Sequence, residues 1–147
     1  MNLHEYQGKE ILASFGVAIQ RGIVAQTAEE AVKAAETLTK ETGTGWHVIK
    51  AQIHAGGRGK GGGVKLAKNL DEVSTIADQI IGMQLITPQT PPQGKPVHQV
   101  LVCEDVYYPG ASETSEFYVS VLLNRATGRN MIMYSAEGGL DIETVAE

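Results

Sequence analysis

The chain has 147 residues, a formal net charge of −5 and 42% hydrophobic residues, enough for one globular domain or two small ones. The acidic balance argues against a general affinity for nucleic acid or for an anionic membrane. A single cysteine, Cys103, excludes an internal disulfide and suits a reducing compartment, and no apolar run approaches the ~20 residues that span a bilayer. We therefore expect a cytoplasmic protein with neither nucleic acid nor membrane as a partner.

The first 45 residues predict a helix, a strand and a second helix. Apolar residues fall near helical spacing in Leu3–Phe15, and Val17–Ala25 has the composition of a strand. Thr27 and Glu30 form a capping-box pattern ahead of an Ala-rich amphipathic helix that should end near residues 41–43.

The middle of the chain predicts a second strand-helix alternation. Two strands flank the glycine-rich stretch, and Asn69 is placed to cap a helix over residues 70–82. A Pro/Gly-rich connector then leads into another strand. The predicted strands and the connector are Trp46–Ile53, Val64–Ala67, Val97–Cys103 and Thr87–Pro96 respectively.

The last part of the chain predicts a hairpin, with strands at Glu116–Leu123 and Met131–Ser135 joined through a turn at Thr127-Gly128. The order β-α-β-β-α-β followed by a hairpin indicates the α+β class. The sequence stops within an amphipathic pattern, Asp141–Glu147, so we expect it to be a piece of a longer chain.

The stretch Lys50–Lys65, KAQIHAGGRGKGGGVK, holds six of the 17 glycines and four cations. Gly57-x-Gly59-x-x-Gly62 matches a dinucleotide fingerprint, but a strand follows it where that site requires a helix. A Walker A loop fails as well, because Gly61 stands after Lys60 where a Ser or Thr hydroxyl is needed.

What remains is a mobile glycine-rich loop between two strands, whose backbone N–H groups can fold over phosphate oxygens. Lys50, near a strand end, would aim its ammonium at a phosphate, and Arg58 would close on it from the loop. The alternative is a loose surface turn with solvated cations.

The glycine-rich stretch, together with MNLHEYQGKEIL at the start and SAEGGLDIETVA at the end, resembles the β subunits of succinyl-CoA synthetases, through essentially the whole chain. The resemblance implies an ATP-grasp fold, in which a nucleotide lies between two α+β subdomains. It implies three segments: an N-terminal helix and lead-in strand (1–20), a first subdomain with the glycine-rich loop 56–63 (21–102), and a hinge with an incomplete second subdomain (103–147).

Site residues follow from the resemblance position by position. Lys50 matches the family's phosphate-contacting lysine, and Gly57-Arg58-Gly59 matches its nucleotide-binding loop. The hinge that grips the base through backbone groups falls at Cys103 and Glu104, with Cys103 where the family usually has Glu. Glu116 matches the ribose-binding glutamate, and an insertion within Tyr107–Thr114 precedes it. The positions that carry these roles are Gln20, Lys50, Gly57, Arg58, Gly59, Cys103, Glu104 and Glu116.

For three of these residues, the side-chain chemistry by itself indicates other or additional interpretations. Gln20 lies close to the base pocket by the resemblance, and its amide can face adenine or guanine by flipping, so the choice between ATP and GTP stays open. Glu116 is otherwise a solvated edge-strand charge. Cys103 is expected to be a small buried residue without basic neighbours.

The resemblance implies reversible phosphoryl transfer between ATP or GTP and a histidine of an α subunit, in a heterodimer or heterotetramer. That step is coupled to the citric acid cycle reaction succinyl-CoA + ADP + phosphate = succinate + CoA + ATP, with CoA on the partner subunit. Mg²⁺ accompanies the nucleotide, and its Asn and Asp ligands are expected downstream of Glu147. No catalytic residue is assigned within these 147 residues, and the segment alone is expected to be inactive.

Two other functions remain open at this point. One is a malate–CoA ligase or another ADP-forming acyl-CoA synthetase subunit, and the other is a non-catalytic nucleotide-binding or assembly module. His54, next to the loop, is a possible nucleophile, although a hydrogen-bonding hinge is the favoured reading of a histidine at that place.

Overall fold

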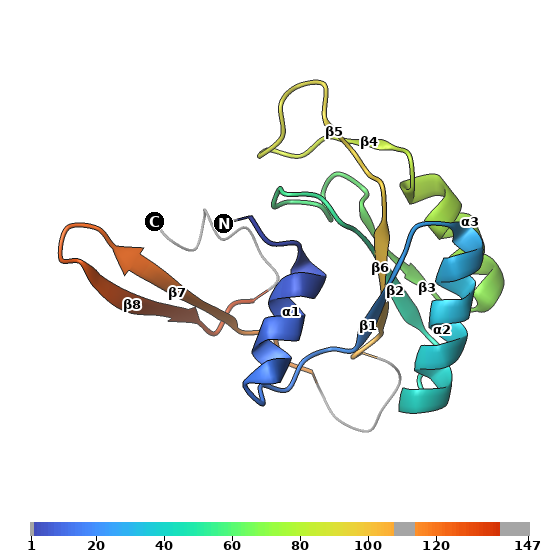
Figure 1. The fold of residues 1–147 in the computed structure, drawn as a ribbon, viewed down its shortest axis with the longest axis horizontal. Coiled ribbons are helices and arrows are strands. Elements are labelled where there is room, and N and C mark those ends of the chain that lie inside the picture. The colour runs from blue at the N-terminus through green and yellow to red at the C-terminus, as the bar shows by residue number, and fades with distance from the viewer. Residues whose placement is uncertain (1, 108–113, 139–147) are drawn as a thin grey trace. The chain divides into compact units, whose positions relative to one another are not determined.

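A computed structural model describes residues 2–107 and 114–138, and the chain divides into two compact units, Met1–Tyr108 and Pro109–Glu147. The first unit contains a four-stranded antiparallel sheet in the order β1-β6-β2-β3 (Figure 1). Its elements are α1 Glu5–Ser14, β1 Gly22–Ala25, α2 Ala28–Thr42, β2 His47–Ala51, β3 Val64–Ala67, α3 Leu70–Ile80, β4 Gln84–Leu85, β5 Lys95–Pro96 and β6 Val100–Glu104. The predicted β-α-β-β-α-β order and the α+β class are confirmed.

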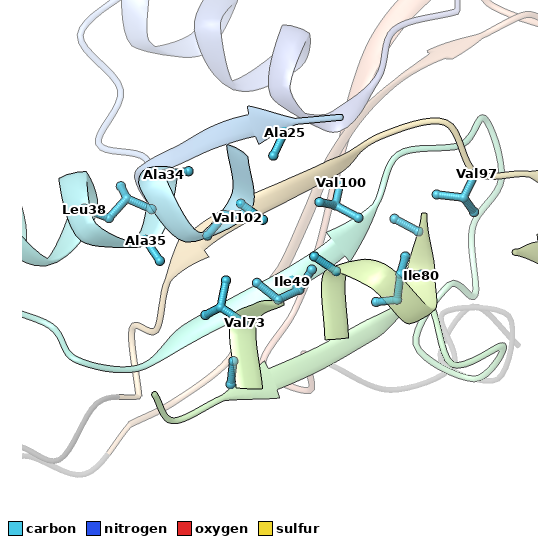
Figure 2. Close-up of a cluster of buried hydrophobic side chains, with 14 of the residues drawn as sticks. Ala25, Ala34, Ala35, Leu38, Ile49, Val73, Ile80, Val97, Val100 and Val102 are labelled. Atoms are coloured by element: carbon cyan, nitrogen blue, oxygen red, sulfur yellow. The ribbon is translucent and has the colours of Figure 1, made fainter. Parts of the chain in front are cut away.

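The two faces of this sheet carry different side chains and are covered by different elements. Along β2, His47, Ile49 and Ala51 are buried, while Val48 and Lys50 between them point to the other face. Helices α2 and α3 cover the first face (Figure 1). Figure 2 shows the core that results, in which helix side chains meet strand side chains; it includes Leu38, Val73, Ile80, Ile49, Val100 and Val102, each at most 1% exposed.

Side-chain caps fix where α2 and α3 begin, as predicted. The Thr27 hydroxyl accepts a hydrogen bond from the Glu30 N–H (3.2 Å), and the Asn69 side chain accepts one from the Glu72 N–H (2.8 Å). The return bond differs from the capping-box expectation, since the Glu30 carboxylate accepts the N–H of Gln26, one residue before the cap, at 2.8 Å.

Strand β1 is shorter than the predicted Val17–Ala25. Its pairing with β6 starts at Gly22 opposite Cys103. Just upstream, the Arg21 carbonyl oxygen still accepts the Glu104 N–H (3.1 Å), but the Arg21 N–H donates to the Glu104 carboxylate (2.7 Å) and not to a backbone oxygen. The short pair β4–β5 was not predicted, because two-residue strands are too short to leave a periodic pattern.

The first helix also differs from a core helix. α1 has no buried residue, and its apolar side chains Ile11, Leu12 and Phe15 are 46%, 49% and 81% exposed. Its polar side chains make the contacts with the rest of the unit, as described below. No helix within residues 2–107 and 114–138 combines the length and apolar character that crossing a membrane requires.

The second unit, by itself, contains the predicted hairpin, with β7 at Tyr118–Asn124 and β8 at Arg129–Ser135. The turn includes Gly128 at φ +65°, a conformation that favours glycine. On one face the side chains of Val119, Val121, Ile132 and Tyr134 are between 65% and 83% exposed. The predicted helical pattern of Asp141–Glu147, and most of the motif Ser135–Ala146 and of the insertion Tyr107–Thr114, lie outside the described residues.

Replacing Ile49 by alanine should destabilise the first unit by about 2 to 5 kcal/mol, because it opens a cavity at the centre of the core. Leu66→Ala, on β3 at 40% exposure, should lose less than about 1 kcal/mol. Equilibrium urea denaturation followed by the fluorescence of Trp46 measures both. Equal losses for the two variants would contradict the assignment of the core to the α2/α3 face.

Candidate functional site

The sheet face away from α2 and α3 carries the predicted phosphate lysine. Lys50 lies opposite Leu101 in the β2–β6 register, and Val48 lies opposite Cys103. On this face Leu101 and Cys103 are almost completely buried, although they lie outside the core under the two helices. Helix α1 lies on this side of the sheet (Figure 1), and its Tyr6, Lys9 and Glu10 line a cavity of about 370 Å³ together with Gln20 and Leu101.

Four donors converge on the carboxylate of Glu5, from α1. Its Oε1 lies 3.1 Å from Lys50 Nζ and 3.3 Å from Lys9 Nζ. Its Oε2 lies 2.8 Å from Arg58 Nη2 and 3.5 Å from the Gln52 amide nitrogen. The side chains of Glu5, Lys9, Lys50 and Arg58 are all 18–21% exposed, so the cluster is largely shielded from water.

The charges in this cluster explain the acidity of Glu5. Burial by itself raises the pKa of the carboxyl, but the charge of Lys50, the hydrogen bond and charge of Arg58, and the charge of Lys9 outweigh it. Together they lower the pKa of Glu5 from an ordinary 4.5 to about 2. The carboxylate is therefore ionised at every pH at which the protein would work.

Gln20 joins Lys50 to the end of β6. Its Oε1 accepts hydrogen bonds from Lys50 Nζ (2.8 Å) and Lys9 Nζ (3.1 Å), and its Nε2 donates to the Glu104 carbonyl oxygen at 2.6 Å. Flipping the amide would turn its NH₂ group toward two ammonium groups, which have no acceptor to offer. In this arrangement the Gln20 Oε1 faces the two ammonium groups, and one N–H of the amide has no hydrogen bond to the described residues.

Cys103 is fully buried on β6, as predicted, but it does have a basic neighbour: Lys9 Nζ lies 3.7 Å from its sulfur. That expectation was wrong because α1 brings the lysine from 94 positions away. Burial still raises the pKa of the thiol, in spite of the opposing charges of Lys50 and Lys9. Cys103 is therefore a neutral packing residue.

The glycine-rich loop is folded back toward Glu5. The Arg58 guanidinium donates through Nη1 to the carbonyl oxygen of Ala51 at the end of β2 (2.6 Å) and through Nη2 to Glu5. The Arg58 carbonyl oxygen accepts the Gly63 N–H (2.8 Å), and Gly57 has φ +70°. A side chain at Gly61 would collide with the Ile86 carbonyl oxygen. The close approach of the loop to the segment at Ile86 therefore requires glycine at this position.

A cavity of about 730 Å³ lies beside this loop. Its lining includes Glu5, Arg58, Lys95 and the backbone of Gly56–Gly59. Such a volume is in the range of small-molecule sites, and the N–H groups and cations around it suit an anionic ligand.

His54, the possible nucleophile, does not have the surroundings of one. Its ring stacks on that of His4, with centroids 4.0 Å apart, and its backbone oxygen accepts a hydrogen bond from Lys95 Nζ at 2.7 Å. Burial, then the charges of His54 and Arg58, lower the pKa of His4. These contacts fit a residue that shapes the end of β2 beside the loop.

The structure thus brings Gln20, Lys50, Arg58, Cys103 and Glu104 together, with Gly57 and Gly59 in the adjoining loop. Glu116 belongs to the second unit, where it is exposed and its carbonyl oxygen accepts the Gly138 N–H at 3.1 Å. Within residues 2–107 and 114–138, no three His, Cys, Asp or Glu side chains are grouped so as to hold a metal ion.

Sequence reasoning missed Glu5, Lys9 and Gln52. A signal for the first two was present, because residues four apart share one face of a helix and the pair Glu5–Lys9 has the favourable order. Gln52 is 3% exposed, donates to Glu5 and to the Lys50 carbonyl oxygen, and directly follows the end of β2, two positions after Lys50.

The Glu5 cluster predicts a specific acid sensitivity. A carboxyl whose pKa is lowered on folding contributes stability that is present above its ordinary value of 4.5 and is lost as the pH falls toward 2. The full shift corresponds to at most about 3.5 kcal/mol. The free energy of unfolding of the unaltered chain should therefore exceed that of Glu5→Gln by more at pH 6 than at pH 2.5, measured by urea denaturation; a constant difference would contradict the ion-pair account.

The comparisons with known proteins agree with this geometry. The chain is 82% identical, over all of its 147 residues and 37% of the relative's length, to the β subunit of the ADP-forming succinate–CoA ligase of Flavobacterium johnsoniae. It is 78% identical over the same shares to that of Christiangramia forsetii. The chain thus spans a little over a third of the length of these curated relatives.

A structural relative shows the same fold. A dinucleotide-forming acetyl-coenzyme A synthetase 1 of Ca. Korarchaeum cryptofilum, in complex with coenzyme A, Ca-AMPCP and HgCl⁺, has a TM-score of 0.64 at 21% identity, over 90% of this chain and 52% of that one. The sequence profile of the ATP-grasp domain matches residues 2–147. The chain belongs to the ATP-grasp family.

Proposed function

We propose that this chain is the nucleotide-binding part of the β subunit of an ADP-forming succinate–CoA ligase. The observation that carries the proposal is that Lys50 contacts Gln20 directly and Arg58 through the shared carboxylate of Glu5, which with Arg58 lines a glycine-rich cavity, in a chain so similar to such subunits. Its proposed segments are the N-terminal residues that contain α1 (1–20), the first subdomain (21–102) and the hinge with the start of the second subdomain (103–147); the predicted lead-in strand forms only from Gly22 onward, as β1.

In this proposal the cationic groups hold the nucleotide's phosphates. Lys50 offers a compact charge from the rigid end of β2, Arg58 offers a planar set of N–H donors from the loop, and the N–H groups of Gly57–Gly59 add backbone donors. Phosphoryl transfer asks little covalent chemistry of the protein, so positioning and charge neutralisation are the contribution of these residues.

The base and sugar would extend from these phosphates along the hinge strand. Backbone groups at Cys103 and Glu104 would contact the base, which makes the identity of the Cys103 side chain unimportant for that contact. Gln20 would present its remaining N–H near the base, and Glu116 would accept hydrogen bonds from the ribose hydroxyls.

The reaction proposed is reversible transfer of a phosphoryl group between a nucleoside triphosphate and a histidine of an α subunit that also carries CoA. Mg²⁺ bound with the nucleotide would neutralise charge between its phosphates. The described residues gather no carboxylates for it, and its protein ligands would lie beyond residue 147.

The test uses the full-length protein assembled with its α subunit. Incubation with radiolabelled ATP or GTP should label a histidine of the α subunit, and addition of succinate and CoA should discharge the label. Discharge with malate but not succinate would point to a malate–CoA ligase. Failure to bind either nucleotide, or binding without labelling, would overturn the proposal.

Lys50→Met should lower kcat/KM for the triphosphate by roughly 10² to 10³, because it removes the cation and keeps much of the apolar stem. Lys33→Met, an equal change at an exposed position of α2, should leave kcat/KM unchanged. Steady-state kinetics of the full-length assembly measure both, with thermal unfolding to verify the fold. An unchanged kcat/KM in Lys50→Met would remove Lys50 from the site.

Gly59→Ala should separate the loop's function from its folding. A Cβ at Gly59 has open space around it and φ there is not positive, so the fold should tolerate alanine. A methyl group between the loop backbone and a phosphate should nevertheless weaken nucleotide binding, by roughly 10-fold. Calorimetric titration of the full-length protein measures this, and Gly8→Ala, also in open space, is the control. Equal affinities in the two variants would argue against backbone contacts from the loop.

A further inference from the structure

Glu5 connects three segments that the sequence separates widely. Its carboxylate contacts Lys9 on α1, Lys50 at the end of β2 and Arg58 in the glycine-rich loop. The two carboxylate oxygens have different partners. Oε1 contacts the two ammonium groups, and Oε2 contacts the Arg58 guanidinium and the Gln52 amide nitrogen. All of the ionic contacts of Glu5 are 3.3 Å or shorter.

Lys50 and Arg58 need such a partner when no ligand is present. Both are long, flexible side chains of like charge, and each would gain conformational freedom and lose repulsion by turning away into solvent. A shared carboxylate removes the repulsion and selects one orientation for each. Because Arg58 also holds the Ala51 carbonyl oxygen, the same contact fixes the loop beside the end of β2.

We infer that Glu5 is a positioning residue for nucleotide phosphates, which holds the Lys50 ammonium and the Arg58 guanidinium in place before the nucleotide arrives. This inference rests on the proposed function. The donors that remain support it: toward the described residues, Lys50 uses two of its three N–H groups, on Glu5 and Gln20, and Arg58 uses two of its five, on Glu5 and Ala51. Each cation keeps donors for a phosphate oxygen.

The opposite role, an internal anion that the phosphates displace, fits the contacts less well. If Lys50 and Arg58 left Glu5, Lys9 would be its one remaining cation among the described contacts, at a site that is only 19% exposed, and a shielded charge with few partners is unfavourable. With Glu5 in place, three cations and one carboxylate still leave a net charge of +2 for a polyphosphate.

The test compares Glu5→Gln with Glu36→Gln in the full-length protein assembled with its α subunit. Glu36 is exposed on α2, so its variant makes the same chemical change far from the cluster. Glu5→Gln should lower kcat/KM for MgATP, in labelling of the α-subunit histidine, by roughly 10-fold to 100-fold, because small displacements of positioning groups have effects of that size. Glu36→Gln should match the unaltered protein.

A double-mutant cycle separates positioning from a general loss of structure. Because Glu5 acts partly through Lys50 and partly through Arg58, the double variant Glu5→Gln/Lys50→Met should lose less kcat/KM than the product of the two single losses. Fully multiplicative losses would show that Glu5 does not act through Lys50 and would overturn the inference. An unchanged or tighter affinity for MgATP in Glu5→Gln would overturn it as well.

Glu5→Asp keeps the inference testable if Glu5→Gln does not fold, as judged by thermal unfolding. The aspartate keeps the charge but withdraws it by one methylene, so it should retain the fold and still lose kcat/KM; full activity in a folded Glu5→Asp assembly would contradict the inference. Failure of the proposed function has a different signature, because the unaltered protein and Glu36→Gln would then also fail to use ATP or GTP.

Discussion

The alternation of side chains along β2 is the constraint on which the rest of the first unit depends. Ile49 points into the core under α2 and α3, and Lys50, the next residue, points to the opposite face, where α1 and the loop lie. Strand β2 is hydrogen-bonded to β6 on one side and to β3 on the other, so the backbone that carries the Lys50 side chain is held rigidly. The hydrophobic core and the charged cluster around Lys50 therefore lie on opposite faces of one strand, so a substitution on one face should leave the contacts of the other largely intact.

Charge balance explains how a cationic site can exist in a protein of net charge −5. Lys9, Lys50 and Arg58 would repel one another without an anion between them. The single carboxylate of Glu5 makes their close approach favourable and still leaves the cluster with a net positive charge. Helix α1, which buries no apolar side chain, depends on the same contacts for its place on the sheet. Helix α1 and the cations Lys50 and Arg58 therefore stabilise each other's positions.

The sequence was sufficient where structure is determined locally. The caps at Thr27 and Asn69 and the strand-loop-strand around Lys50–Lys65 depend on neighbouring residues, and all are present. It was insufficient where distant segments meet: Glu5 is 45 positions from Lys50, and the Glu104 carboxylate accepts the Arg21 N–H from 83 positions away. The resemblance supplied candidate residues such as Gln20, but only the fold brings its amide between two ammonium groups and a carbonyl oxygen.

The hairpin β7–β8 leads to a physical argument about the intact protein. Its face of Val119, Val121, Ile132 and Tyr134 remains exposed, and a single two-stranded hairpin is at best marginally stable in water. Apolar patches of this kind are normally covered in a folded protein. The chain spans only 37% of the length of its relatives, so a longer protein would have ample further chain to cover this face. The cluster of Glu5, Lys50 and Arg58, by contrast, is complete within the first unit and does not depend on such a cover.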